Sequence, residues 1–223
     1  MDGWKGTLFL GIGYAVVISW GLELSINRVF GAVFGSGIKY YVASLWGITV
    51  LRLLLMGIFL KWLNLNWANL WRGEPSFKGL GLAFLCALVL LLPIAVPALL
   101  MKAYHPQILG EYRYFLKLAS GDRAMAVFAL FSQYVYYLVE ALSVNMLYLG
   151  SAKFVGEKSA IVIPMVFWGA MHILQALNRP LPVATTVAIL ASVEAGVMYG
   201  YAYKTGNMIG PLIIFFTVVT FAV

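Results

Sequence analysis

One long apolar run with a single charge near its centre constrains this chain more than any other feature. The run extends from Phe128 to Gly150, and its only charged residue is Glu140. As an α-helix it would rise about 35 Å, enough to cross a hydrocarbon core of roughly 30 Å. A carboxylate at that depth costs at least ~2.5 kcal/mol, so we expect Glu140 to face a partner or a polar cavity. The best candidate for the partner is His172, in the next apolar segment.

Further apolar segments predict about six more membrane crossings. Only 10% of the 223 residues are charged, against about 25% in soluble domains. The expected spans cover residues 7–24, 40–60, 79–101, 128–150, 160–177, 183–203 and 208–223. We therefore expect an all-α polytopic protein, integral to a lipid bilayer, with about seven transmembrane helices in one bundle. Residues 1–127 would supply N-terminal helices and interfacial segments, and residues 128–223 a four-helix core.

Several polar residues near the first two spans leave alternatives open. Glu23 and Arg28 lie five residues apart near the end of the first span, where they would form an interfacial pair or remain solvated. Residues 29–37 are glycine-rich and short, which favours an interfacial or re-entrant stretch. Arg52 lies inside the second span and would either snorkel to the interface or pair with Glu23 or another buried acid. Residues 111–120 are typical of an amphipathic helix at the membrane surface.

The distribution of charge excludes some functions and leaves orientation undetermined. The net charge is +7, but the 15 Lys and Arg residues mostly flank the spans, where cations meet anionic headgroups, so we expect no nucleic-acid binding. Across seven spans the alternate loops hold seven cations on each side, so the positive-inside rule favours neither orientation.

The single cysteine, Cys86, excludes an intrachain disulfide.

Four motifs follow one another between residues 140 and 211. They are Glu140-Ala141-Leu142-Ser143-Val144-Asn145, Trp168-Gly169-Ala170-Met171-His172, Gly196-Val197-Met198-Tyr199-Gly200-Tyr201-Ala202-Tyr203 and Thr205-Gly206-Asn207-Met208-Ile209-Gly210-Pro211. In order and spacing, this part of the chain resembles the CAAX-protease and bacteriocin-processing (CPBP, or Abi) family of intramembrane peptidases, which includes the prenyl-protein endopeptidases. The resemblance implies that residues 128–223 form a core like the one in that family.

The resemblance also implies roles for Glu140 and His172. In that family the first Glu and the first His of the pattern activate a water molecule that attacks the scissile carbonyl, and these two residues occupy those positions here. A buried carboxylate beside an imidazole suits a general base.

Other polar positions of the family pattern are changed in this chain. They are Ala141 in place of a second Glu, Asn145 in place of an Arg, Phe215 in place of a second His and Val219 in place of an Asn. Phenylalanine and valine side chains have no hydrogen bond to donate to a developing oxyanion, and losing one such donor typically costs about 10²- to 10³-fold in rate. The interpretation that we favour is a protein without catalytic activity, which serves as a binding, scaffold or accessory subunit beside other membrane proteins.

Alternative functions use the same residues. The first is an active CAAX-type endopeptidase built on Glu140 and His172, with Asn145 in support or with a protonated Glu194 as a substitute hydrogen-bond donor. The second is a subunit that holds a pigment or haem at His172. No cofactor is predicted, although Glu140, His172 and Glu194 together are a conceivable site for a divalent metal ion. A structural alternative is a hydrogen bond between Glu140 and His172 that only joins two helices.

Three glycines in the motifs predict close helix packing. Gly196 and Gly200 lie four residues apart on an apolar helix, the spacing that lets two helices approach closely. Gly169 on the preceding span is the expected contact surface. We therefore expect these glycines to support the fold rather than to bind a ligand.

Overall fold

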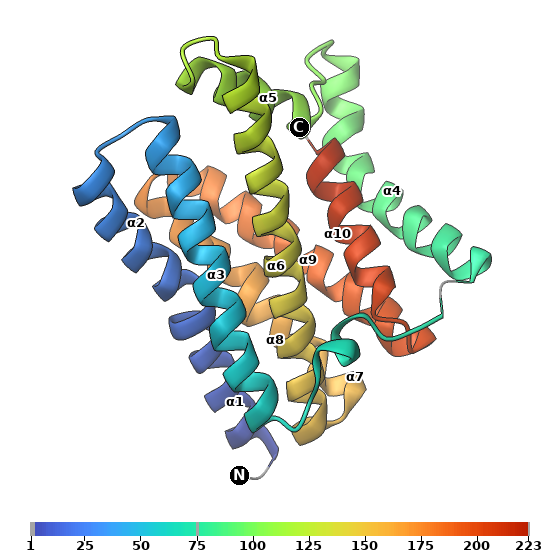
Figure 1. Cartoon of the computed structure of the whole chain (residues 1–223). Helices are drawn as coiled ribbons and strands as arrows, with labels where there is room; N and C mark the ends of the chain where they lie inside the picture. Colours follow the sequence, from blue (N-terminus) through green and yellow to red (C-terminus); the bar gives the residue numbers. More distant parts are fainter. Residues whose placement is uncertain (1–2, 75, 223) are drawn as a thin grey trace.

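The computed structural model describes residues 3–74 and 76–222, and within these ranges it contains helices and no strands. Figure 1 shows the helices gathered side by side in one bundle. In chain order they are α1 (Gly3–Gly13), the π-helix η1 (Tyr14–Ile18), α2 (Trp20–Phe34), α3 (Ile38–Trp62), the 3₁₀ helix η2 (Trp67–Trp71), α4 (Phe77–Leu100), α5 (Gln107–Leu118), α6 (Arg123–Val155), α7 (Glu157–Ala160), α8 (Val162–Pro164), the π-helix η3 (Met165–Gly169), the 3₁₀ helix η4 (Ala170–Leu177), α9 (Leu181–Thr205) and α10 (Ile209–Phe221).

The predicted fold class is confirmed, with one adjustment to the number of spans. Six helical segments of the described chain are long and apolar enough to cross a membrane, namely Gly3–Phe34, Ile38–Trp62, Phe77–Leu100, Arg123–Val155, Glu157–Leu177 and Leu181–Thr205. The chain is therefore an all-α, multi-pass integral membrane protein. The expected seventh span is the 13-residue helix α10. At roughly 20 Å it is short of a full crossing, and it packs against α4, α6 and α9.

The first span is longer than expected and irregular in the middle. It runs through α1, η1 and α2 for 32 residues. Residues 29–34, which we expected to belong to an interfacial or re-entrant stretch, instead complete α2, and Gly35 follows with a φ of 69°. At the π-helical turn the amide of Ser19 bonds to the carbonyl of Tyr14, five residues earlier, at 2.9 Å. Such turns are rare and are often found at functional sites.

Helix α6 is the central element of the bundle. It begins where the Asp122 side chain accepts a hydrogen bond from the Met125 amide at 3.1 Å, and it ends at Gly156, whose φ is 80°. Every residue from Ala141 to Ser151 is buried. Figure 1 shows α6 between the N-terminal helices α1 and α3 and the C-terminal helices α9 and α10, and it contacts α1, α3, α5, α7, α8 and α10. Both parts of the chain therefore share one core.

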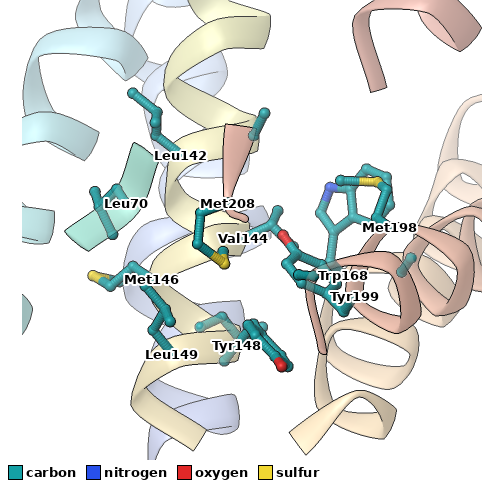
Figure 2. Packing of buried hydrophobic residues seen from close by; sticks show 14 of the residues in the cluster. Leu70, Leu142, Val144, Met146, Tyr148, Leu149, Trp168, Met198, Tyr199 and Met208 are labelled. Carbon is teal, nitrogen blue, oxygen red and sulfur yellow. The ribbon is translucent and has the colours of Figure 1, made fainter. Parts of the chain in front are cut away.

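The buried side chains around α6 come from segments that are distant in sequence. Figure 2 shows Val144 of α6 near Met208, Tyr199 and Trp168, which belong to later parts of the chain. The rings of Tyr148 and Tyr199 stack with centroids 4.7 Å apart. The amphipathic helix expected at residues 111–120 is observed as α5, which packs on α6 and α10 and buries Phe115.

Candidate functional site

A buried arginine and a glutamate from the first two spans form one half of the candidate site. Arg52 of α3 is fully buried, and its Nη2 donates a hydrogen bond to Oε1 of Glu23 in α2. The Tyr136 hydroxyl of α6 donates to the same carboxylate oxygen at 2.8 Å. The Arg52 guanidinium carbon also lies 4.9 Å from the centre of the Tyr136 ring. Of the alternatives considered for Arg52, the structure shows pairing with Glu23, and Glu23 pairs with Arg52 instead of Arg28.

The π-helix η1 supplies a backbone acceptor to this pair. Nε of Arg52 donates to the carbonyl oxygen of Ile18, the last residue of η1, at 3.0 Å. A π-helical turn displaces carbonyl groups from the regular helical ladder, so such an oxygen becomes available to a side chain. Just beyond η1, a Cβ atom at Gly21 would lie 2.0 Å from the Val16 carbonyl oxygen, so only glycine fits the local backbone.

The second half of the site is built around Glu140. Its Oε1 accepts a hydrogen bond from the indole Nε1 of Trp168 at 2.9 Å, and Trp168 lies in the second π-helix, η3. Nδ1 of His172 is 2.8 Å from the Trp168 carbonyl oxygen and 3.2 Å from that of Gly169. Among the hydrogen bonds of the described residues, none joins Glu140 directly to His172. The hydrogen-bond partner of Glu140 is therefore Trp168, while Nδ1 of His172 bonds to carbonyl groups of its own helix.

The two halves are close enough to interact through their charges. Glu140 lies within the range of charge–charge interaction with Arg52, Glu23 and His172, and Glu194 of α9 interacts in the same way with Glu140. We call these five residues the buried polar cluster; Arg52 is fully buried, and the other four are half-buried. Glu23, Arg52, Glu140 and Glu194 are far apart in the sequence, and the fold brings them together. Within the described chain, Arg52 Nη1 and Glu194 Oε1 are buried atoms without a hydrogen-bond partner.

Asn145 is one of the residues that the family resemblance assigned to the site, and its amide group joins three other segments. The fully buried side chain donates through Nδ2 to the carbonyl oxygens of Leu70 at 2.7 Å and Met208 at 3.3 Å. Its Oδ1 accepts from the Tyr199 hydroxyl at 2.9 Å. Asn145 thus ties η2, α9 and the segment before α10 to α6, which is a structural role.

The other positions that the resemblance aligns with polar residues of that family are filled by apolar packing. Ala141 is 1% exposed and Phe215 is 5% exposed. The ring of Phe215 lies 6.0 Å from that of Trp168 and 6.1 Å from that of Tyr137, measured between centroids. Val219 packs against the same core. The rings of Phe215 and Tyr137 therefore pack on the side of Trp168, the residue that bonds to Glu140.

The three glycines differ in how closely they approach other helices. A Cβ at Gly169 would lie 2.5 Å from the Cα of Ser192, so this glycine lets η3 and α9 meet at their backbones. A Cβ at Gly196 would meet only the flexible side chain of Met165, at 3.3 Å, and one at Gly200 would meet nothing within 4 Å. The tight contact between these helices therefore depends on Gly169.

The surroundings of His172 bear on the metal and pigment alternatives. Its ring lies between those of Trp20 and Trp168, with centroid distances of 5.6 and 5.1 Å. Throughout residues 3–74 and 76–222, no three His, Cys, Asp or Glu side chains come together in a way that could hold a metal ion. The divalent-metal and pigment alternatives at His172 therefore stay predictions.

Sequence reasoning missed two aromatic residues of the site. Trp168 appeared in the sequence analysis only as the first residue of a motif, and no bond from Tyr136 to Glu23 was expected, yet each of these aromatic residues bonds to a carboxylate of the buried polar cluster. Their helical spacing was a usable signal, because Tyr136 lies one turn before Glu140 and Trp168 one turn before His172.

Comparisons with family models, curated proteins and solved structures found no match for this chain. The likeness to intramembrane peptidases therefore rests on the four motifs alone.

Proposed function

We propose that this chain is a membrane-embedded binding or scaffold subunit whose peptidase-like core does not cleave peptide bonds. The observation that carries the proposal is an aromatic side chain, Phe215, packed at the position where the family resemblance places a hydrogen-bond donor. A general base must lie within hydrogen-bond reach of the water that it activates. Trp168 orients one oxygen of Glu140, and among the described residues the other oxygen and Nε2 of His172 make no hydrogen bond, so the case against catalysis depends on the missing oxyanion donor.

The packing of Phe215 matters because of the chemistry of peptide cleavage. A peptidase must stabilise the negative charge that develops on the carbonyl oxygen, and it does so with hydrogen-bond donors aimed at that oxygen. The position that the family resemblance assigns to such a donor is occupied by a phenylalanine packed against Trp168 and Tyr137. An aromatic ring there stabilises the helix packing and offers no donor.

An active endopeptidase is the second candidate, and one observation favours it. Glu140 interacts through its charge with both His172 and Glu194, although the three residues come from three different spans. In this alternative Trp168 moves aside when substrate binds, and Glu194 supplies the missing hydrogen-bond donor.

A hydrolysis assay separates the two candidates. The wild-type protein in lipid nanodiscs would be given fluorogenic peptides with and without a prenyl group, beside Glu140→Gln and Trp168→Phe variants. We expect no turnover above that of empty nanodiscs for any of the three proteins. Turnover by the wild type that disappears in Glu140→Gln would refute the proposal and establish the peptidase.

Crosslinking in native membranes tests the scaffold role itself. We expect a discrete crosslinked species larger than one chain, and we expect Glu140→Gln to retain it because the carboxylate serves no chemistry. A wild-type chain that remains uncrosslinked at every reagent concentration would contradict the role. The same purified protein tests the pigment alternative, since a visible absorption band that is lost in His172→Ala would establish a chromophore at that residue.

A further inference from the structure

A cavity of about 370 Å³ lies at the end of the bundle where α4 begins and α9 ends. It is separate from the buried polar cluster. Its lining combines both signs of charge, hydroxyl and amide groups, and one apolar residue at the inner end. The residues that line it are Gly73, Glu74, Ser76, Lys78, Gly79, Leu82, Tyr201, Thr205, Gly206 and Asn207.

Hydrogen bonds hold the walls of this cavity in place. The Met208 amide donates to the Arg72 carbonyl at 2.8 Å, and Asn207 Nδ2 donates to the Glu74 carbonyl at 3.3 Å. Across the cavity, the Tyr201 hydroxyl donates to the Gly79 carbonyl at 3.0 Å. Gly73 has a φ of 131°, and a Cβ there would lie 2.7 Å from Asn207 Oδ1. The cavity is therefore formed in advance, which lowers the entropic cost of binding a ligand.

The two charged side chains of the lining are not engaged with each other. Among the described residues the ion pairs are Arg52–Glu23 and Arg72–Glu157, so Lys78 and Glu74 form none although both line one cavity. Both side chains are exposed in the lining, so they are available to a ligand that carries a negative and a positive charge.

The position of the cavity relative to the spans indicates where such a ligand comes from. Two membrane-spanning helices, α4 and α9, have their ends at this cavity, so it lies at the boundary between the lipid and the water. Leu82 lines its inner side, and the exposed side chains of Leu85 and Val89 continue the same face of α4 toward the membrane interior. The lining thus changes from charged to apolar in the direction of an inserted acyl chain.

We propose that this cavity binds the headgroup of a zwitterionic phospholipid with a primary ammonium group, such as phosphatidylethanolamine. The phosphate lies against the Lys78 ammonium at the start of α4, where the positive end of the helix dipole favours an anion, although the Gly79 amide is already capped by the Ser76 hydroxyl. The lipid ammonium donates hydrogen bonds to the Glu74 carboxylate. One acyl chain runs past Leu82 along the exposed face of α4.

Native mass spectrometry of the purified protein tests this assignment. The wild type would be mixed with equal amounts of phosphatidylethanolamine, phosphatidylcholine and phosphatidylglycerol. We expect phosphatidylethanolamine to be retained most strongly, because choline has no N–H group and phosphatidylglycerol has no cation for Glu74. Lys78→Gln should weaken its binding by about tenfold, the equivalent of one charge-assisted hydrogen bond. Glu74→Gln should shift the preference toward phosphatidylglycerol, since the remaining lysine still binds a phosphate.

Lys158→Gln is the matched control, because Lys158 lies on α7 at the same end of the bundle but outside the cavity. We expect it to retain the wild-type order of lipids. Equal retention of the three lipids by the wild type, or wild-type binding by Lys78→Gln, would overturn the proposal. Soluble phosphoethanolamine should bind far more weakly than the lipid, because it lacks the chain that contacts Leu82. Equal affinity for the two would assign the cavity to a soluble ligand and overturn the lipid assignment.

Discussion

Two arginine–glutamate pairs in this chain occupy opposite surroundings. Arg52 and Glu23 meet inside the spans, and their side chains are 0% and 18% exposed. Arg72 and Glu157 meet at the end of the bundle at 3.4 Å, with side chains 48% and 49% exposed. The inner pair has further partners in Ile18 and Tyr136.

The difference shows what a buried charge requires of the chain around it. At the surface, water solvates each ion, so the pair gains little from contact. Inside the bundle, desolvation costs several kcal/mol per ion, and additional hydrogen bonds must offset it. The π-helix η1 and the Tyr136 hydroxyl supply those bonds. The inner pair should therefore depend on an exact arrangement of three helices, and the outer pair should not.

The largest expected effect comes from removing the inner arginine. Arg52→Ala leaves the half-buried Glu23 carboxylate without its cation, which should cost up to about 3–5 kcal/mol of unfolding free energy. The measurement is reversible unfolding by denaturing detergent in mixed micelles. A loss of unfolding free energy below about 1 kcal/mol in Arg52→Ala would contradict the claim that the inner pair matters more than the outer pair.

Arg72→Ala is the control for that experiment. Its pair is half exposed and screened, so we expect a loss of about 0–1 kcal/mol that shrinks further in high salt. The loss in Arg52→Ala should respond little to salt, because the inner pair is shielded from solvent ions.

Asn145 extends the comparison from charged to neutral buried groups. Asn145→Ala removes three hydrogen bonds and leaves the Tyr199 hydroxyl without its acceptor, so we expect a loss of about 2 kcal/mol. The exposed Asn178→Ala is the matched control and should change stability by no more than about 0.5 kcal/mol. Equal losses in the same unfolding assay would contradict the structural role of Asn145.

The hydrogen bond between Trp168 and Glu140 should have a smaller effect. Trp168→Phe keeps an aromatic ring in the core but removes the indole donor, which should cost about 1–2 kcal/mol. In a Glu140→Gln background the same substitution should cost less, because the acceptor is no longer charged. Purely additive losses in this double-mutant cycle would show that the two side chains are not coupled.

The smallest expected effect is a pH dependence at the edge of the bundle. Burial of Glu111 on α5 raises the pKa of its carboxyl above the usual 4.5, although hydrogen bonds from Gln107 and Tyr137 oppose the shift. The folded state therefore binds the proton more tightly than the unfolded state does. This contribution to stability is complete below pH 4.5 and is lost as the pH rises through the folded-state pKa.

Thermal unfolding across that range tests the sign of the effect. The wild type should lose stability as the pH rises from 4.5 toward neutral, and Glu111→Gln should abolish that slope because its amide does not titrate. A stability that increases with pH through Glu111 would contradict the assignment.

The comparison also shows how far the sequence alone could predict this site. The apolar run around Glu140 correctly predicted a span with a buried acid, because only a helix of that length satisfies its backbone in lipid. The residue that bonds to this acid is Trp168 rather than the expected His172, whose Nδ1 bonds within its own helix. The pairing of Arg52 with Glu23 was only one of several alternatives until the fold placed α2 beside α3.

The sequence by itself determined the class of fold and the approximate spans, since the length and hydrophobicity of each run are local properties that the bilayer selects. It also located the acids and the arginine within those spans. Only the tertiary structure decided which of these charged residues meet. Helices α2, α3, α6 and α9 each carry one acid or arginine of the cluster, and helix packing sets how these helices are rotated relative to one another. The same packing produces the two π-helices, in which Ile18 accepts a hydrogen bond from Arg52 and Trp168 donates one to Glu140.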